Sequence, residues 1–195
     1  MGLPAFQTEP TEDVSPEDYL RLERQSEVKH EYIKGKIRAM AGAGYTHNLI
    51  CANLTIEIGS QLRGKSYSVV GSDQRLQILS GSAFTYPDLT VVCGKPEFNE
   101  EKKPDTLLNP TLLVEVLSPT TGQYDRSDKF MLYRQVPSLR QYLTLDSLFV
   151  HAELYTLDEL GRWVLTETSD LAAALDLASI GCQVPLAEAY TGVTF

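Results

Sequence analysis

Long apolar runs are missing from this sequence, and so is an N-terminal signal. No run of about 18 apolar residues occurs, so hydropathy predicts no membrane-spanning segment. The opening residues, MGLPAFQTEPTEDVSPEDY, show neither a basic start followed by an apolar stretch nor the hydroxyl residue of a myristoylation motif. We therefore expect a cytoplasmic protein that has no membrane partner.

Cysteine is also scarce, and the known cysteine and glycine motifs are absent. Cys51, Cys93 and Cys182 are far apart and show no CxxC spacing, which disfavours a disulfide framework or a zinc cluster. Cys93 ends an apolar run and is predicted to be a small core residue. GAGYTH lacks the Lys-Ser/Thr of a phosphate-binding loop, and no G-x-S-x-G or HExxH motif occurs.

Basic residues are rare at both ends of the chain. Residues 1–23 hold one arginine and six acids, and residues 141–195 hold one arginine and eight acids. Residues 24–140 hold 15 bases and 12 acids, although the whole chain carries a net charge of −9. Any polyanion should therefore bind to the middle segment. The net negative charge of the whole chain would give little electrostatic assistance to this binding.

The length of 195 residues suits one domain. We expect residues 1–14 to form a flexible tail and residues 15–195 to form the domain. Capping residues and helical spacing predict helices that begin near Ser15 and Thr46, and Lys34-Gly35 predicts a hairpin. Strands are predicted over 67–79, with a bend near Gly71, over 85–94 and 111–118, and over three segments between 138 and 168. The pattern predicts an α/β (α+β) fold with a mixed sheet flanked by helices.

The apolar strand at 111–117 carries one carboxylate, Glu115. Both of its faces are otherwise apolar, which is typical of a central strand that is buried on both sides. A lone ionised carboxylate there would be costly, so it needs a cation, a hydrogen-bond network or a metal. The alternative is a partly exposed strand end, where a lysine or backbone donors satisfy Glu115.

Asp88 repeats this anomaly at the start of the strand in TYPDLTVVC. Taken alone, Pro-Asp is a common turn dipeptide. Adjacent strands lie about 4.8 Å apart, however, so Asp88 and Glu115 on one sheet face could share a hard divalent cation. Mg²⁺ suits such a pair, because it takes one or two carboxylates together with waters and phosphate oxygens.

A third helix, over 124–136, has an inward-facing stripe that includes Lys129. It directly follows the Glu115 strand and should pack back on the sheet, where the lysine could reach both carboxylates and stabilise charge on a phosphate. The alternative is an ordinary Asp125–Lys129 pair at i,i+4 spacing, with the lysine stem lying on apolar surface.

Several motifs in this order resemble the Uma2 family (DUF820), restriction-endonuclease-like proteins of the PD-(D/E)xK nuclease superfamily. The motifs are YPD at 86–88, VEVLSP at 114–119, YDRSDKFMLYRQVPSLRQYL at 124–143 and SEVKHEYIKGKIRAMAGAGYTHNLI at 26–50, and the resemblance covers about residues 14–192. It implies a restriction-endonuclease-like mixed β-sheet with flanking helices, to which this chain would add C-terminal β-hairpins, and a divalent metal.

The resemblance has one departure and two further matches. The superfamily places a lysine two residues after the strand acid, where this chain has Leu117, so Lys129 on the following helix becomes the candidate cation. Glu31 matches as a supporting acid that holds metal through water or orients the attacking water; alternatively it is a hairpin surface charge. His47 could contact a phosphate or bond to Glu31, or it is a structural histidine.

These observations favour a Mg²⁺- or Mn²⁺-dependent endonuclease that hydrolyses DNA. Asp88 and Glu115 would hold the metal, and Lys129, Glu31 and His47 would assist. One alternative is an inactive nuclease-fold protein that binds nucleic acid or a protein partner; another is a structural homo-oligomer. A homodimer is expected, because cleavage of both DNA strands needs two active sites and terminal strands offer edges for pairing.

Overall fold

The computed structural model describes residues 13–78, 81–99, 105–119 and 122–195. A mixed six-stranded sheet runs through its centre in the order β11-β10-β9-β8-β6-β3. Only β8 and β9 pair in parallel within it; the other neighbours are antiparallel. The strands are β3 (Tyr67–Gly71), β6 (Leu89–Cys93), β8 (Leu112–Leu117), β9 (Gln141–Asp146), β10 (Ala152–Leu157) and β11 (Trp163–Thr168).

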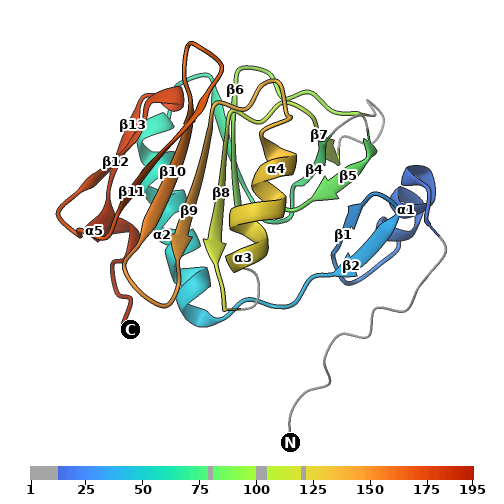
Figure 1. The fold of residues 1–195 in the computed structure, drawn as a ribbon, viewed down its shortest axis with the longest axis horizontal. Coiled ribbons are helices and arrows are strands. Elements are labelled where there is room, and N and C mark those ends of the chain that lie inside the picture. Colours follow the sequence, from blue (N-terminus) through green and yellow to red (C-terminus); the bar gives the residue numbers. More distant parts are fainter. Residues whose placement is uncertain (1–12, 79–80, 100–104, 120–121) are drawn as a thin grey trace, which may run out of the picture.

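Strand β8 lies at the centre of this sheet, as its apolar sequence predicts. All six of its residues are buried. One face, with Leu112, Val114 and Val116, packs in a core with the long helix α2 (Tyr45–Leu62) and the C-terminal hairpin. That hairpin consists of β12 (Ala174–Leu177) and β13 (Cys182–Pro185), with the short helices η3 (Ala178–Ile180) and α5 (Leu186–Ala189) beside it. Figure 1 shows α2 and this hairpin on the same side of the sheet.

The opposite face of β8 is covered by the helical segment that connects it to β9. This segment comprises α3 (Gly122–Tyr124), a π-helical turn η2 (Asp125–Lys129) and α4 (Phe130–Tyr133). Leu113 of β8 and Tyr142 of β9 pack with Leu132 and Tyr133 of α4. The predicted inward stripe of this helix is confirmed, because Asp125, Lys129, Leu132, Tyr133 and Val136 are all buried.

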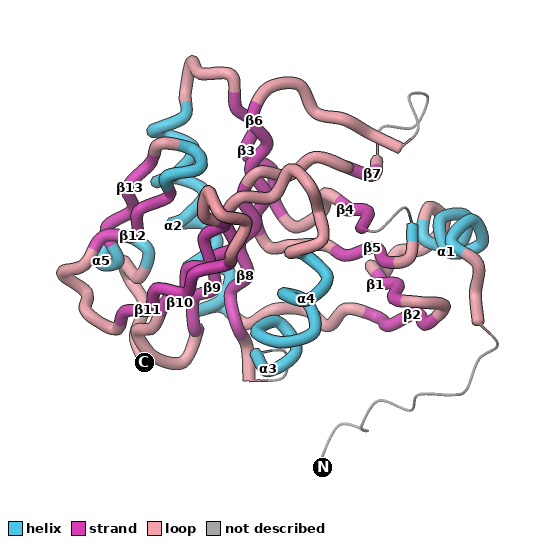
Figure 2. Tube along the Cα trace, turned by 45° about the horizontal axis from the view of Figure 1, so that its top comes forward, coloured by secondary structure: helices cyan, strands magenta, loops and turns pink. Residues whose placement is uncertain are grey.

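A second sheet lies beyond the α3–α4 segment, in the order β2-β1-β5-β4-β7 (Figures 1 and 2). Lys34 and Gly35 adopt left-handed φ angles of 46° and 87° and join β1 to β2, which confirms the predicted hairpin. Helix α1 (Pro16–Glu23), capped by Ser15, packs Tyr19 against this sheet. The strands are β1 (His30–Ile33), β2 (Lys36–Ala39), β4 (Arg75–Ile78), β5 (Ala83–Thr85) and β7 (Thr106–Leu107).

Three local predictions need correction. The segment 67–79 is two strands in different sheets, because the chain turns at Gly71–Gln74 and Lys29 binds the carbonyl of Ser72 there. Cys93 is exposed, because it is the last residue of β6. Gly44, not Thr46, caps α2. The predicted fold class is confirmed, and the predicted C-terminal hairpins are β10–β11 and β12–β13.

Candidate active site

The register between β6 and β8 brings Asp88 beside Glu115. Leu89 pairs with Val114, so Asp88, one residue before β6, stands next to Glu115 across the two strands. The backbone N–H of Val116 donates to Asp88 Oδ2 at 2.8 Å, which fixes that carboxylate against β8. Among the described residues, no hydrogen bond is made to Asp88 Oδ1 or to Glu115 Oε2. Each carboxylate therefore keeps one oxygen available for another ligand.

Lys129 lies among three carboxylates. Its Nζ is 3.0 Å from Glu115 Oε1, 3.0 Å from Glu31 Oε1 and 3.2 Å from Asp125 Oδ1. All four side chains are buried. The sequence predicts that Lys129 reaches both Asp88 and Glu115. The structure confirms the contact with Glu115, but the other partners of Lys129 are Glu31 and Asp125, not Asp88. Because three acids surround one base, this lysine cluster is acidic overall when all of its members are ionised.

Burial and neighbouring charges shift the pKa values of Glu115 and Lys129. Burial alone acts in opposite directions on the two groups, yet both pKa values are raised. Burial raises the pKa of Glu115 well above its usual range, and the negative charges of Asp88 and Asp125 add to this, whereas Lys129 and the hydroxyl of Tyr133 act against it. That hydroxyl donates to Glu115 Oε1 at 2.7 Å. Burial lowers the pKa of Lys129, but the surrounding acids outweigh burial and raise it well above its usual value. This direction favours the ammonium form of Lys129 near neutral pH.

Two acceptor atoms of the lysine cluster are incompletely satisfied. Glu31 Oε1 and Asp125 Oδ1 are buried within ion-pair distance of Lys129 Nζ, yet neither receives a hydrogen bond from a described donor. Buried polar atoms normally have such a partner. The excess of acids and the open carboxylate oxygens fit a divalent cation that prefers oxygen ligands, so the donor set suits Mg²⁺ or Mn²⁺.

His47 stands on the other side of Asp88. Its Nε2 lies 3.1 Å from Asp88 Oδ2, and its Nδ1 lies 3.6 Å from the sulfur of Cys51, one helical turn further along α2. The expected bond to Glu31 is not formed; His47 contacts Asp88 in its place. Burial lowers the pKa of His47, but the hydrogen bond to Asp88 and the charge of Asp88 outweigh burial and raise it.

Sequence reasoning missed two residues at the margin of the site. Arg38 pairs with Glu31 in the β1–β2 register, and its exposed guanidinium lies 4.9 Å from the centre of the Tyr124 ring. Lys129 Nζ lies 5.8 Å from the centre of the same ring, so the side chains of Arg38 and Lys129 both approach Tyr124. Both residues could have been found, Arg38 from the hairpin register and Tyr124 from its place just before the inward helical stripe.

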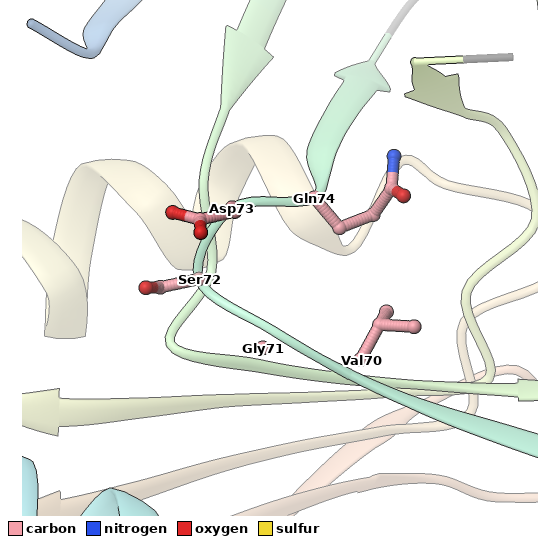
Figure 3. A pocket seen from close by; sticks show the side chains of 5 residues that line it. All are labelled: Val70, Gly71, Ser72, Asp73 and Gln74. Atoms are coloured by element: carbon pink, nitrogen blue, oxygen red, sulfur yellow. The ribbon is translucent and has the colours of Figure 1, made fainter.

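A separate surface hollow of about 320 Å³ lies at the turn between β3 and β4. It is lined by residues 70–74, and in Figure 3 the oxygen atoms of Ser72 and Asp73 point to the same side of this turn. None of the predicted site residues lines it. The hollow is therefore separate from the region of Asp88, Glu115 and Lys129.

A six-stranded mixed sheet with helices on both faces, with Glu115 on β8 and Asp88 just before the neighbouring strand β6, matches the restriction-endonuclease-like fold that the sequence predicts. A solved structure from Anabaena variabilis, "a putative nuclease belonging to DUF820", matches 93% of this chain and 99% of its own length with a TM-score of 0.77 at 18% identity. That match shows the common fold.

The family follows from the sequence comparisons. The model of Uma2, whose description is "Putative restriction endonuclease", matches residues 16–187, and the chain belongs to this family. The uncharacterized protein slr1290 of Synechocystis sp. is 36% identical over 188 residues, covering 95% of this chain and 96% of that protein. The uncharacterized protein sll1609 of the same organism is 33% identical over 157 residues, covering 80% and 88%. Among the described residues, no helix is long and apolar enough to cross a membrane.

Proposed function

We propose that this chain is a divalent-metal-dependent endonuclease that hydrolyses phosphodiester bonds of DNA. One observation carries the proposal: Asp88 and Glu115 stand side by side on neighbouring strands, and a buried lysine from the next helix contacts Glu115. Lys129 thus supplies a cation at the strand acid although residue 117 is a leucine. Membership in a family whose description is "Putative restriction endonuclease" supports this proposal.

Asp88 and Glu115 would hold the metal, Mg²⁺ or Mn²⁺, through carboxylate oxygens. When bound, such an ion polarises a phosphoryl oxygen and lowers the pKa of an attacking water. Lys129, as an ammonium group near neutral pH, would hold Glu115 in place and stabilise negative charge that develops on the phosphate. Glu31, paired with Lys129, would accept a hydrogen bond from the attacking water. His47 contacts Asp88, and we assign it the role of orienting that ligand.

Arg38 supports nucleic acid as the substrate. Arg38 is an exposed residue whose guanidinium lies 4.9 Å from the centre of the Tyr124 ring, beside the lysine cluster, and no described carboxylate lies within ion-pair distance of it. A planar guanidinium at the margin of a hydrolytic site suits a backbone phosphate. It belongs to the middle segment of the chain, where the bases are concentrated.

Cleavage of duplex DNA on both strands favours a homodimer. Strand β11 is an edge strand of the main sheet, and most of its residues are exposed, including Val164 and Leu165. Edges of this kind are usually protected or paired. Light scattering should give twice the mass of the chain, and a monomer at all concentrations would contradict the dimer.

The test of function is a cleavage assay on plasmid, single-stranded DNA and RNA with Mg²⁺, Mn²⁺ or EDTA. We expect DNA cleavage that requires the metal and falls at least about 100-fold in Asp88→Asn and Glu115→Gln. Asp73→Asn is the matched control, because Asp73 is an exposed acid at the β3–β4 turn. Absence of cleavage of any substrate in excess metal would refute the enzyme proposal.

A second candidate is a nuclease-fold protein that binds nucleic acid or a protein partner without cutting. The observation that favours it is the enclosure of Lys129, which is only 5% exposed and has three acidic partners. DNA binding without turnover, unchanged by Asp88→Asn, would support this candidate. A homodimer that binds no metal, no DNA and no other protein would support a purely structural role.

A further inference from the structure

The first turns of α2 bring a histidine and a cysteine to the same carboxylate that faces Glu115. His47 and Cys51 are four residues apart, so they share one face of the helix. One donor atom from each of His47, Cys51 and Asp88 lies within 4.8 Å of the other two. The side chains of His47 and Asp88 are only 13% and 16% exposed, and Cys51 is half-buried.

These three donors differ in chemistry from the pair on the strands. Mg²⁺ takes oxygen ligands and does not select a thiolate. Zn²⁺ and related ions take nitrogen, sulfur and oxygen together, in four-coordinate sites with three protein ligands and one open position. Asp88 therefore has two alternative sets of neighbours: Glu115 on β8, which supplies oxygen, and His47 with Cys51 on α2, which supply nitrogen and sulfur.

A nucleophilic Cys–His–Asp arrangement is the competing interpretation of the same contacts. A nucleophilic cysteine needs a thiolate that its surroundings stabilise. Burial raises the pKa of the Cys51 thiol, and the negative charges of Asp88 and Glu115 raise it further. The geometry decides between the two interpretations: the three donor atoms lie within 4.8 Å of one another, so one ion could contact all three, and this convergence favours a metal-binding role.

We propose that His47, Cys51 and Asp88 form a site for a thiophilic divalent transition metal such as Zn²⁺. On binding, the S–H bond of Cys51 breaks, its proton passes to solvent, and the thiolate sulfur bonds to the ion. Because Asp88 belongs to this site and to the pair with Glu115, occupancy by zinc weakens Mg²⁺ binding. This last consequence rests on the proposed function, whereas the zinc site itself does not.

The direct test uses Co²⁺ as a spectroscopic substitute for Zn²⁺ in chelator-treated, reduced, full-length protein. Coordination by Cys51 predicts a thiolate-to-cobalt charge-transfer band that saturates near one equivalent and disappears when Zn²⁺ is added. Cys51→Ser should lose the band. Cys93→Ser is the matched control and should keep it, because Cys93 is exposed at the far end of β6. Circular dichroism checks that both variants fold.

The outcomes separate the zinc site from the nuclease. A band that survives in Cys51→Ser, or Co²⁺ binding with no charge-transfer band in the wild type, would overturn the site. Calorimetry should show that one equivalent of Zn²⁺ weakens Mg²⁺ binding in the wild type and in Cys93→Ser, but not in Cys51→Ser. If Zn²⁺ leaves the Mg²⁺ affinity of all three proteins equal, the coupling of the two sites through Asp88 is overturned. A Cys51-dependent band in a protein that cuts no DNA would leave the site standing and refute only the proposed function.

Discussion

Removal of the buried ammonium of Lys129 should destabilise the fold strongly. Lys129→Met keeps the apolar stem but leaves Glu31, Glu115 and Asp125 without the cation that lies 3.0 to 3.2 Å from each. Breaking a buried ion pair from one side costs about 3–5 kcal/mol. Since small proteins are stable by only about 5–15 kcal/mol, this is a large share of the free energy of unfolding.

The assay is urea unfolding of metal-free protein in EDTA near neutral pH. Arg21→Met is the control: it removes a cation whose pair with Asp18 is exposed, and it should leave the midpoint unchanged. The double variant Glu115→Gln/Lys129→Met should recover part of the loss, with a coupling energy of about 1–3 kcal/mol. A Lys129→Met midpoint equal to that of Arg21→Met would refute the buried ion network.

Three further predictions concern single residues. The raised folded-state pKa of Glu115 means that the wild type loses stability as pH rises above the ordinary carboxyl pKa. Glu115→Gln lacks this titration, so in urea unfolding in EDTA it should become more stable relative to the wild type as pH rises from about 5 to about 8. Arg38→Ala should lower the slope of log K for DNA binding against log salt by about one in fluorescence anisotropy, whereas Arg63→Ala, about 24 Å from His47 along α2, should not. Asp105→Asn should lower the free energy of unfolding by about 1 kcal/mol near neutral pH. Burial raises the pKa of Asp105, but hydrogen bonds from Arg24 and Thr106 outweigh burial and hold this pKa at about 2. The stability that Asp105 contributes should therefore fade in an acid titration as pH falls below 3.8 toward 2.

Local patterns explain what the sequence could predict. Two apolar faces indicate a doubly buried strand, and β8 is one, with Glu115 3% exposed. Lys34-Gly35 favours a two-residue turn because glycine accepts positive φ, and the hairpin forms there. The inward stripe of residues 124–136 places Lys129 against the sheet. Each of these features depends on residues close together in the chain.

Features that depend on distant pairing were not predictable in the same way. The sequence indicates a bend near Gly71, but not that β3 and β4 join different sheets, which is decided by their partners β6 and β5. The contact of His47 with Asp88 spans 41 residues and depends on how α2 crosses the sheet. The π-helical turn at Asp125–Lys129 also has no clear signal in the sequence. Cys51 is different, because its i+4 spacing from His47 was visible.

Asp88 and Glu115 should together hold one divalent ion. Isothermal calorimetry with Mg²⁺ and Mn²⁺ on chelator-treated protein tests it before any substrate is chosen. We expect binding of about one ion per chain, lost in Asp88→Asn and in Glu115→Gln and retained in the control Asp73→Asn. Binding that persists unchanged in both site variants, or no binding by the wild type, would contradict it.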